Sequence, residues 1–112
     1  MVTRRSSPKY GLDKAKSVPV GKVKFSRAAA RDIENMGYTV QDVKDCIDGL
    51  QEFNFTMKVV FDYGEADEYL YRHELEPIDD LSEATYDELY LKFKLREEET
   101  KIYFLSFHPQ RR

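Results

Sequence analysis

The 112-residue sequence has no tryptophan, a single cysteine and no long apolar run. Because a lone Cys46 cannot form an internal disulfide, it is most simply a small core residue of a protein from a reducing compartment. No segment approaches the ~20 apolar residues that span a bilayer. The basic first residues are not followed by the apolar segment of a targeting peptide. We therefore expect a cytoplasmic protein that does not associate with a membrane.

Several catalytic motifs are also absent from the sequence. It contains no glycine-rich phosphate loop, no cysteine and histidine cluster with the spacing of metal ligands, and no Ser-His-Asp arrangement. These absences argue against ATP-dependent and zinc chemistry. We predict that the protein uses no cofactor and no metal.

Charge is distributed unevenly along the chain. The formal net charge is −3, but the first quarter and the last residues are basic while the centre is acidic. Residues 1–20 have little apolar content, so we predict a flexible basic tail that lies outside the core. Such a tail either keeps the protein soluble or binds a partner. Residues 21–112 are then one domain with a single hydrophobic core.

Two segments have the apolar spacing of amphipathic helices. Ser26 is a suitable N-cap for residues 27–36, and Gly37 ends that segment. Thr39 caps a second helix, whose apolar stripe consists of Val40, Val43, Ile47 and Leu50. The second helix also carries three aspartates, which a DNA major groove would repel, so we exclude a DNA-reading helix-turn-helix.

Alternating apolar and polar residues predict strands in the rest of the chain. The strands lie within residues 53–63, 67–74, 88–96 and 102–107, and residues 20–25 can add a short edge strand. An acidic connection before residue 88 contains one helical turn at 81–87. The predicted fold is α+β, with two N-terminal helices packed on a twisted antiparallel sheet of four or more strands.

The chemistry concentrates in residues 88–108. The period-2 pattern places Tyr90, Lys92 and Lys94 together on the polar face of one strand. The next strand is almost entirely apolar or aromatic and ends at His108. We therefore expect a cationic, tyrosine-bearing strand face with a histidine beside it.

Six short motifs occur in a fixed order between residues 22 and 108: Phe25-Ser26-Arg27-Ala28-Ala29, Asp48-Gly49-Leu50, Phe53-Asn54-Phe55, Tyr71-Arg72, Tyr90-Leu91-Lys92 and Leu105-Ser106-Phe107. In this order and spacing they resemble the MqsR family of bacterial toxins. The resemblance implies a RelE-like fold, ribosome-independent cleavage of mRNA and neutralisation by a cognate antitoxin protein.

The resemblance also implies candidate site residues. The active-site tyrosine of the family falls on Tyr90. Its glutamine three residues before Tyr-Arg is replaced by Glu68, and its C-terminal lysine after Ser-Phe is replaced by His108. Its remaining lysine falls near Met57 or, with a shift of one residue, on Lys58, and the tryptophan often found in the family is missing.

Metal-free RNA cleavage requires a base for the 2′-OH proton, a cation for the phosphate and an acid for the leaving 5′-oxygen. Glu68 or His108 can be the base, and His108 or Tyr90 the acid, since an imidazole changes its charge near neutral pH. The cations available to hold the phosphate are Lys58, Arg72 and Lys92. We predict an endoribonuclease that cuts single-stranded mRNA by 2′-OH attack and leaves a 2′,3′-cyclic phosphate.

Two other functions fit the sequence. A catalytically inactive relative that binds protein or RNA agrees with the acidic balance and the replaced site residues. A transcriptional regulator acting through the basic tail would bind duplex DNA with a steep salt dependence. The individual residues also have structural explanations, because Tyr90 can be a cross-strand packing partner and Arg72 can pair with Glu68 or Glu74.

Overall fold

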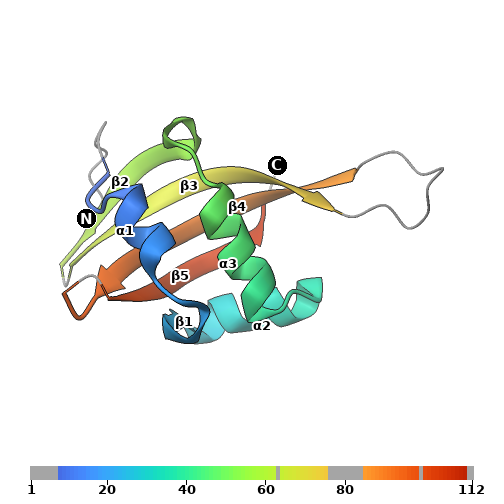
Figure 1. The fold of residues 1–112 in the computed structure, drawn as a ribbon, viewed down its shortest axis with the longest axis horizontal. Helices are drawn as coiled ribbons and strands as arrows, with labels where there is room; N and C mark the ends of the chain where they lie inside the picture. Colours follow the sequence, from blue (N-terminus) through green and yellow to red (C-terminus); the bar gives the residue numbers. More distant parts are fainter. Residues whose placement is uncertain (1–7, 63, 76–84, 99, 111–112) are drawn as a thin grey trace.

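The computed structural model describes residues 8–62, 64–75, 85–98 and 100–110 (Figure 1). Five strands form one sheet in the order β1-β5-β4-β3-β2. The helices are α1 (Leu12–Ser17), α2 (Arg27–Met36) and α3 (Val40–Gly49), with short 3-10 turns η1 (Val20–Lys22) and η2 (Glu52–Asn54). The strands are β1 (Val23–Phe25), β2 (Phe55–Phe61), β3 (Gly64–Leu75), β4 (Thr85–Arg96) and β5 (Lys101–Pro109).

The two predicted helices begin and end where their capping residues indicate. The Ser26 hydroxyl accepts a hydrogen bond from the Ala29 N–H at 3.1 Å, and Gly37 ends α2 in the left-handed region with φ 75°. Thr39 and Asp42 form a reciprocal capping box at the start of α3. Both predictions are therefore confirmed. Helix caps could be predicted because they depend on local sequence.

The sheet agrees with the predicted α+β class and differs from it in one pairing. Strands β2 to β5 form the expected antiparallel meander. The sheet as a whole is mixed, however, because β1 pairs with β5 in parallel, with Val23 opposite Ile102. A parallel neighbour needs a long crossover connection, which α2, α3 and the rest of the chain supply.

The prediction that residues 1–20 lie outside the core is wrong for the described part of that segment. Residues 12–17 form a third helix, and Ala15 and Val18 are buried at 1% and 2% exposure. The Lys44 ammonium ties α1 to α3 by donating to the Lys16 carbonyl at 2.7 Å. Residues 1–7 lie outside the described residues.

The predicted helical turn at residues 81–87 is wrong where the structure describes it, because β4 already begins at Thr85. The remainder of that turn lies outside the described residues. Figure 1 shows the ends of β3 and β4 extending beyond the helices as a two-stranded arm.

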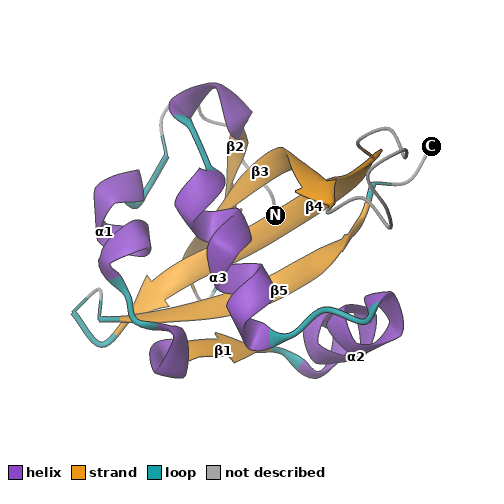
Figure 2. Cartoon of the chain, turned by 45° about the vertical axis from the view of Figure 1, so that its right-hand side comes forward, coloured by secondary structure: helices purple, strands orange, loops and turns teal. Residues whose placement is uncertain are grey.

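One face of the sheet carries the hydrophobic core. Figures 1 and 2 show α1 and α3 on this face and α2 beside β1 and β5. Aromatic rings form its centre, where Tyr69 stacks on Phe93 at 5.4 Å and Phe93 contacts Phe104 at the same distance. Cys46 is fully buried in this core, and burial raises the pKa of its thiol to about 12. Within the described residues, no helix has the length and apolar character of a membrane span.

Candidate active site

The other face of the sheet gathers the polar side chains of three neighbouring strands. Tyr90 and Lys92 of β4 alternate with the core residues Leu89 and Leu91, so their side chains project away from the helices. Tyr90 is paired with His108 of β5, and Lys92 is paired with Glu68 of β3. Residues that are far apart in the sequence therefore meet across β3, β4 and β5.

Tyr90, Lys92, His108 and Glu68 form a cluster on this face, and Glu68 is its buried member. Only 8% of the residue is exposed, although it lies on the face that the helices leave open. The Tyr90 hydroxyl donates a hydrogen bond to one carboxylate oxygen of Glu68, and the Thr56 hydroxyl donates to the other at 2.8 Å. Both oxygens are therefore occupied by hydroxyl donors, which stabilise the buried carboxylate.

Tyr90 is held in its protonated form by these surroundings. Burial raises its pKa above the ordinary value of tyrosine, and the hydrogen bond to Glu68 and the charge of that carboxylate raise it further. The side chain is therefore a neutral phenol at physiological pH, and its proton points toward Glu68.

His108 lies against the Tyr90 ring. The two rings are stacked, with centroids 4.8 Å apart and planes inclined by 9°. The Nδ1 atom of His108 is 2.7 Å from the carbonyl oxygen of Pro109. Because a carbonyl can only accept, Nδ1 carries the proton, which leaves the Nε2 lone pair available in the neutral ring.

A row of cations continues along β4 from this cluster. Lys92 lies over the ring of Phe61, with Nζ 5.6 Å from the ring centroid. Burial lowers the pKa of Lys94, and the nearby charge of Arg96 lowers it further. The Arg96 guanidinium in turn covers the ring of Tyr103 at 4.2 Å. Lys92 and Arg96 therefore each lie over an aromatic ring, in a band of cations and rings across the open face.

The structure does not bring Lys58 to this cluster. Its neighbours Met57 and Val59 pair with Glu68 and Ala66, whereas Lys58 pairs with Asp67 and faces the helix side of the sheet. Its Nζ atom lies 3.7 Å from a carboxylate oxygen of Glu65.

Arg72 shares the open face with Glu68 but lies farther out on the arm. Its Nε atom is 2.9 Å from a carboxylate oxygen of Glu88, and its guanidinium covers the Tyr86 ring at 4.6 Å. The partner of Arg72 is thus a residue on the adjacent strand rather than Glu68 or Glu74.

Sequence reasoning missed two residues of the cluster, Thr56 and Ser106. Thr56 reaches Glu68 because the register of β2 and β3 shifts between Phe55 and Met57. Ser106 is opposite Lys92 because a second shift follows Lys92 in the pairing of β4 with β5. Strict alternation does not predict such bulges, and neither residue has a local signal that would reveal it.

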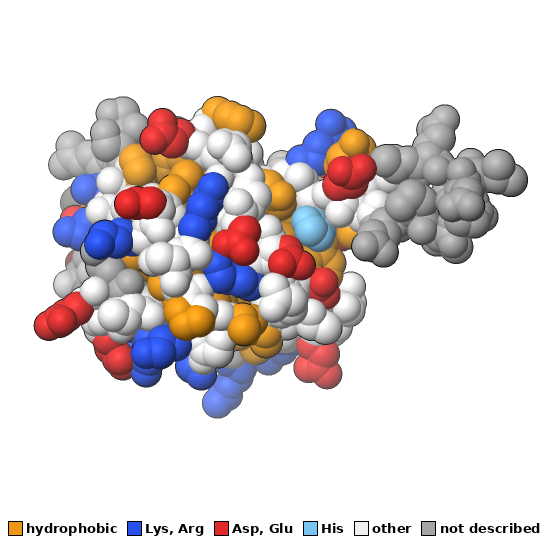
Figure 3. All heavy atoms as spheres, viewed as in Figure 1, with side chains coloured by type: hydrophobic (Ala, Val, Ile, Leu, Met, Phe, Trp, Pro, Cys, Tyr) orange, Lys and Arg blue, Asp and Glu red, His pale blue; other side chains and the backbone are white. Residues whose placement is uncertain are grey.

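The two faces of the sheet differ in their charge pattern. Figure 3 shows the helix side, where acidic and basic side chains are interspersed and no single sign dominates. On the open face, the described cations of β4 follow one another at every second residue, at Lys92, Lys94 and Arg96. The part of the chain that the structure describes contains no group of three metal-binding side chains.

Comparison with known proteins provides no assignment, because no family model, no curated protein and no solved structure matches the chain. The interpretation of the site therefore depends on its geometry and on the chemistry of its residues.

Proposed function

We propose that this protein is an endoribonuclease that cleaves single-stranded mRNA by attack of the 2′-OH group. The observation that carries the proposal is the stacking of His108 on a tyrosine that Glu68 fixes in place, next to Lys92 on an uncovered sheet face. We further propose that the fold is RelE-like and that the protein is an MqsR-type toxin, neutralised by an antitoxin protein.

His108 is the proposed general base. The hydrogen bond of Nδ1 to the Pro109 carbonyl directs the Nε2 lone pair away from the backbone. Nε2 removes the proton of the 2′-OH group while the 2′-oxygen attacks the phosphorus atom. Glu68 is less suited to this role because both of its oxygens already accept hydrogen bonds.

Lys92 is the proposed cation at the phosphate. Its position on β4 is diagonal to that of His108 on β5, and such positions are about 7–8 Å apart. The ammonium group lies over the Phe61 ring of β2, so it turns toward β5 when it meets a phosphate beside His108. Its ammonium group stabilises the charge that grows on the phosphate and donates a proton to the leaving 5′-oxygen. The products are a 2′,3′-cyclic phosphate and a 5′-hydroxyl. The imidazolium of His108 then loses its proton to solvent and the Lys92 amine takes one up from solvent, which restores both groups.

Tyr90 and Glu68 are proposed to position the base rather than to transfer protons. If Tyr90 lost its proton, two negative charges would lie side by side in a half-buried site, because the Glu68 carboxylate is its neighbour. Burial and this neighbouring charge raise the pKa of Tyr90, so the phenol keeps its proton. The neutral phenol instead provides a rigid platform for the His108 ring. Replacement of Tyr90 by Phe should preserve the stack and lose only the orientation that Glu68 provides.

Single-stranded RNA fits the band of cations and rings on β4 and β5. Nonspecific single-strand binding combines a positively charged path for the backbone with aromatic side chains on which bases stack. Arg96 and Tyr103 form such a pair at 4.2 Å, on the same sheet face as Lys92. Binding should therefore weaken as the salt concentration rises.

The proposal is tested by inducible expression in a bacterial host, with growth scored and mRNA 5′ ends mapped. The account expects growth arrest and cuts at a short motif, both lost in Tyr90→Phe/His108→Ala. Normal growth with intact mRNA, in cells that contain folded protein, would contradict it.

A catalytically silent binding module is the second candidate. The observation that favours it is the Glu68 carboxylate, which lies beside Lys92 and reduces the positive potential available to a phosphate. This alternative predicts RNA or protein binding without cleavage, so the mapping of 5′ ends distinguishes the two.

A further inference from the structure

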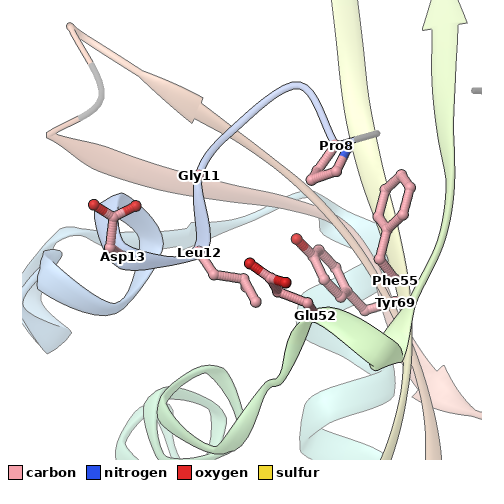
Figure 4. Close-up of a pocket in the computed structure, with 7 residues that line it drawn as sticks. All are labelled: Pro8, Gly11, Leu12, Asp13, Glu52, Phe55 and Tyr69. Carbon is pink, nitrogen blue, oxygen red and sulfur yellow. The ribbon is translucent and has the colours of Figure 1, made fainter. Parts of the chain in front are cut away.

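A cavity of about 510 Å³ opens on the helix side of the sheet, opposite to the proposed ribonuclease site. The segment before α1 and the start of β2 form its walls, and Tyr69 of β3 forms its floor (Figure 4). Its volume is in the range of small-molecule binding sites.

The Tyr69 side chain brings a hydroxyl to the lining of this cavity. The residue is 1% exposed, and its ring is fixed by a stack on Phe93 at 5.4 Å and an edge contact with Phe55 at 5.6 Å. Figure 4 shows the hydroxyl pointing into the space below Pro8. Among the described residues the one buried polar side-chain atom without a hydrogen-bond partner is Glu65 Oε2, so the Tyr69 hydroxyl is not a buried orphan and is open to the cavity.

Glu52 contributes a carboxylate to the lining of the same cavity. In Figure 4 this carboxylate is drawn on the Tyr69 side of the cavity, while the carboxylate of Asp13 is turned away. Burial raises the pKa of Tyr69, and the charges of Asp67 and Glu52 raise it further, which agrees with this proximity. No lysine or arginine is among the described residues that line the cavity.

We propose that this cavity binds a primary ammonium or guanidinium group carried on a short apolar stem. The head group donates hydrogen bonds to the Glu52 carboxylate and to the Tyr69 hydroxyl oxygen, the two polar groups on this side of the cavity. Leu12 and Pro8 enclose the stem, and the Phe55 ring adds a cation–π contact. An anion is excluded because Glu52 would repel it.

This site is independent of the proposed ribonuclease function. Tyr69 and Glu68 are consecutive residues of β3, so their side chains project to opposite faces of the sheet. A free amine and a basic side chain of a peptide have the same head group and stem, and the experiment below distinguishes these two sources.

The test is a titration of the full chain, followed by ¹H–¹⁵N NMR spectra, with butylammonium, butylguanidinium and the neutral control 1-butanol. The proposal expects saturable shifts at Leu12, Phe55 and Tyr69 with the two cations and none with butanol. Capped tripeptides with a central lysine or arginine form the second arm. Tighter binding of a tripeptide would identify a peptide side chain as the ligand, and tighter binding of the free cation a small amine.

Two variants decide whether the shifts report the proposed site. Glu52→Gln should weaken binding at least tenfold and Tyr69→Phe severalfold, whereas the control Glu34→Gln on the exposed part of α2 should change nothing. Because Glu52 is exposed, its variant remains informative even if Tyr69→Phe fails to fold. Absence of saturable shifts, or equal binding by wild type and Glu52→Gln, would overturn the proposal.

Discussion

Asp67 and Glu68 are consecutive residues of β3, and both carboxylates are buried, yet they serve the two faces of the sheet differently. Asp67 faces the helices and accepts hydrogen bonds from the backbone N–H groups of Lys9 and Tyr10 at 2.7 and 2.8 Å. Glu68 faces the open side and accepts from the Tyr90 and Thr56 hydroxyls. The Asp67 carboxylate binds the segment before α1 to the sheet, and the Glu68 carboxylate orients Tyr90 in the candidate active site.

The largest expected effect separates activity from stability on the open face. His108→Ala should lower RNA cleavage by roughly 10²–10⁴-fold, the usual contribution of a positioned acid or base. The unfolding free energy should hardly change, because His108 is only half-buried and lies outside the core. Single-turnover cleavage and chemical denaturation of the same preparation measure the two quantities.

Two lysines on opposite faces of the sheet, Lys92 and Lys58, test which face carries the active site. Lys92→Ala should impair cleavage, whereas Lys58→Ala should leave it unchanged, because Lys58 faces the helix side and pairs with Glu65. Equal loss of activity in both variants would contradict the assignment of the site to the open face.

On the helix side, Asp67→Ala should reduce stability without a direct effect on the site. The variant leaves two partly buried N–H groups without an acceptor, at a total cost of about 2–3 kcal/mol of unfolding free energy. Urea denaturation of wild type and variant measures the loss. An unchanged midpoint would show that the segment before α1 is not held by this carboxylate.

The same carboxylate predicts a pH dependence. Burial raises the pKa of Asp67, while the two backbone N–H groups and Lys58 partly oppose that shift. A raised folded-state pKa stabilises the protein below the ordinary pKa of aspartate, and this contribution is lost as the pH rises through the folded-state value. Relative to Asp67→Asn, which cannot titrate, the wild type should therefore gain unfolding free energy as the pH falls through that window. A pH-independent difference would contradict this sign.

Gly49 tests how tightly α3 packs on the sheet. A Cβ at this position would collide with the Tyr71 hydroxyl oxygen, so Gly49→Ala should destabilise the protein by about 1–3 kcal/mol. In a Tyr71→Ala background the obstruction is gone, and the same change should stabilise the helix by up to about 1 kcal/mol. Thermal unfolding of the four proteins completes this double-mutant cycle, and additive effects would contradict the close contact.

The smallest effect concerns the Tyr90 phenol. Glu68→Gln removes the charge that contributes to raising the pKa of Tyr90, so that pKa should fall toward the ordinary value while burial keeps it above. The ¹³Cζ chemical shift of Tyr90 during a pH titration reports this change. An unchanged titration would show that Glu68 does not act on the phenol.

The sequence predicted the parts of the fold that depend on neighbouring residues in the chain, namely helix ends and strand faces. The caps at Ser26 and Thr39 set both long helices, and alternation placed Tyr90 and Lys92 on one strand face. The helix α1 was missed because this segment buries few residues, Ala15 and Val18, with Leu12 packed against the core. The hydrogen bond to its Lys16 carbonyl comes from Lys44, 28 residues farther along the chain.

The candidate site was predictable only in part. Tyr90, His108 and Glu68 meet as expected, but their neighbours depend on two register shifts that simple alternation does not predict. Lys58 was assigned through the family resemblance alone, and the alternation along β2 already separates it from Met57 and Val59. The cavity at Tyr69 had no sequence signal, because it forms where the segment before α1 crosses the sheet.

The most direct test of the central claim is incubation of the purified protein with a single-stranded RNA in the presence of EDTA, followed by analysis of the new ends. The account predicts cleavage that yields 2′,3′-cyclic phosphate and 5′-hydroxyl ends, is unaffected by the chelator and is lost in His108→Ala. Intact RNA, or cleavage that survives the loss of His108, would contradict it.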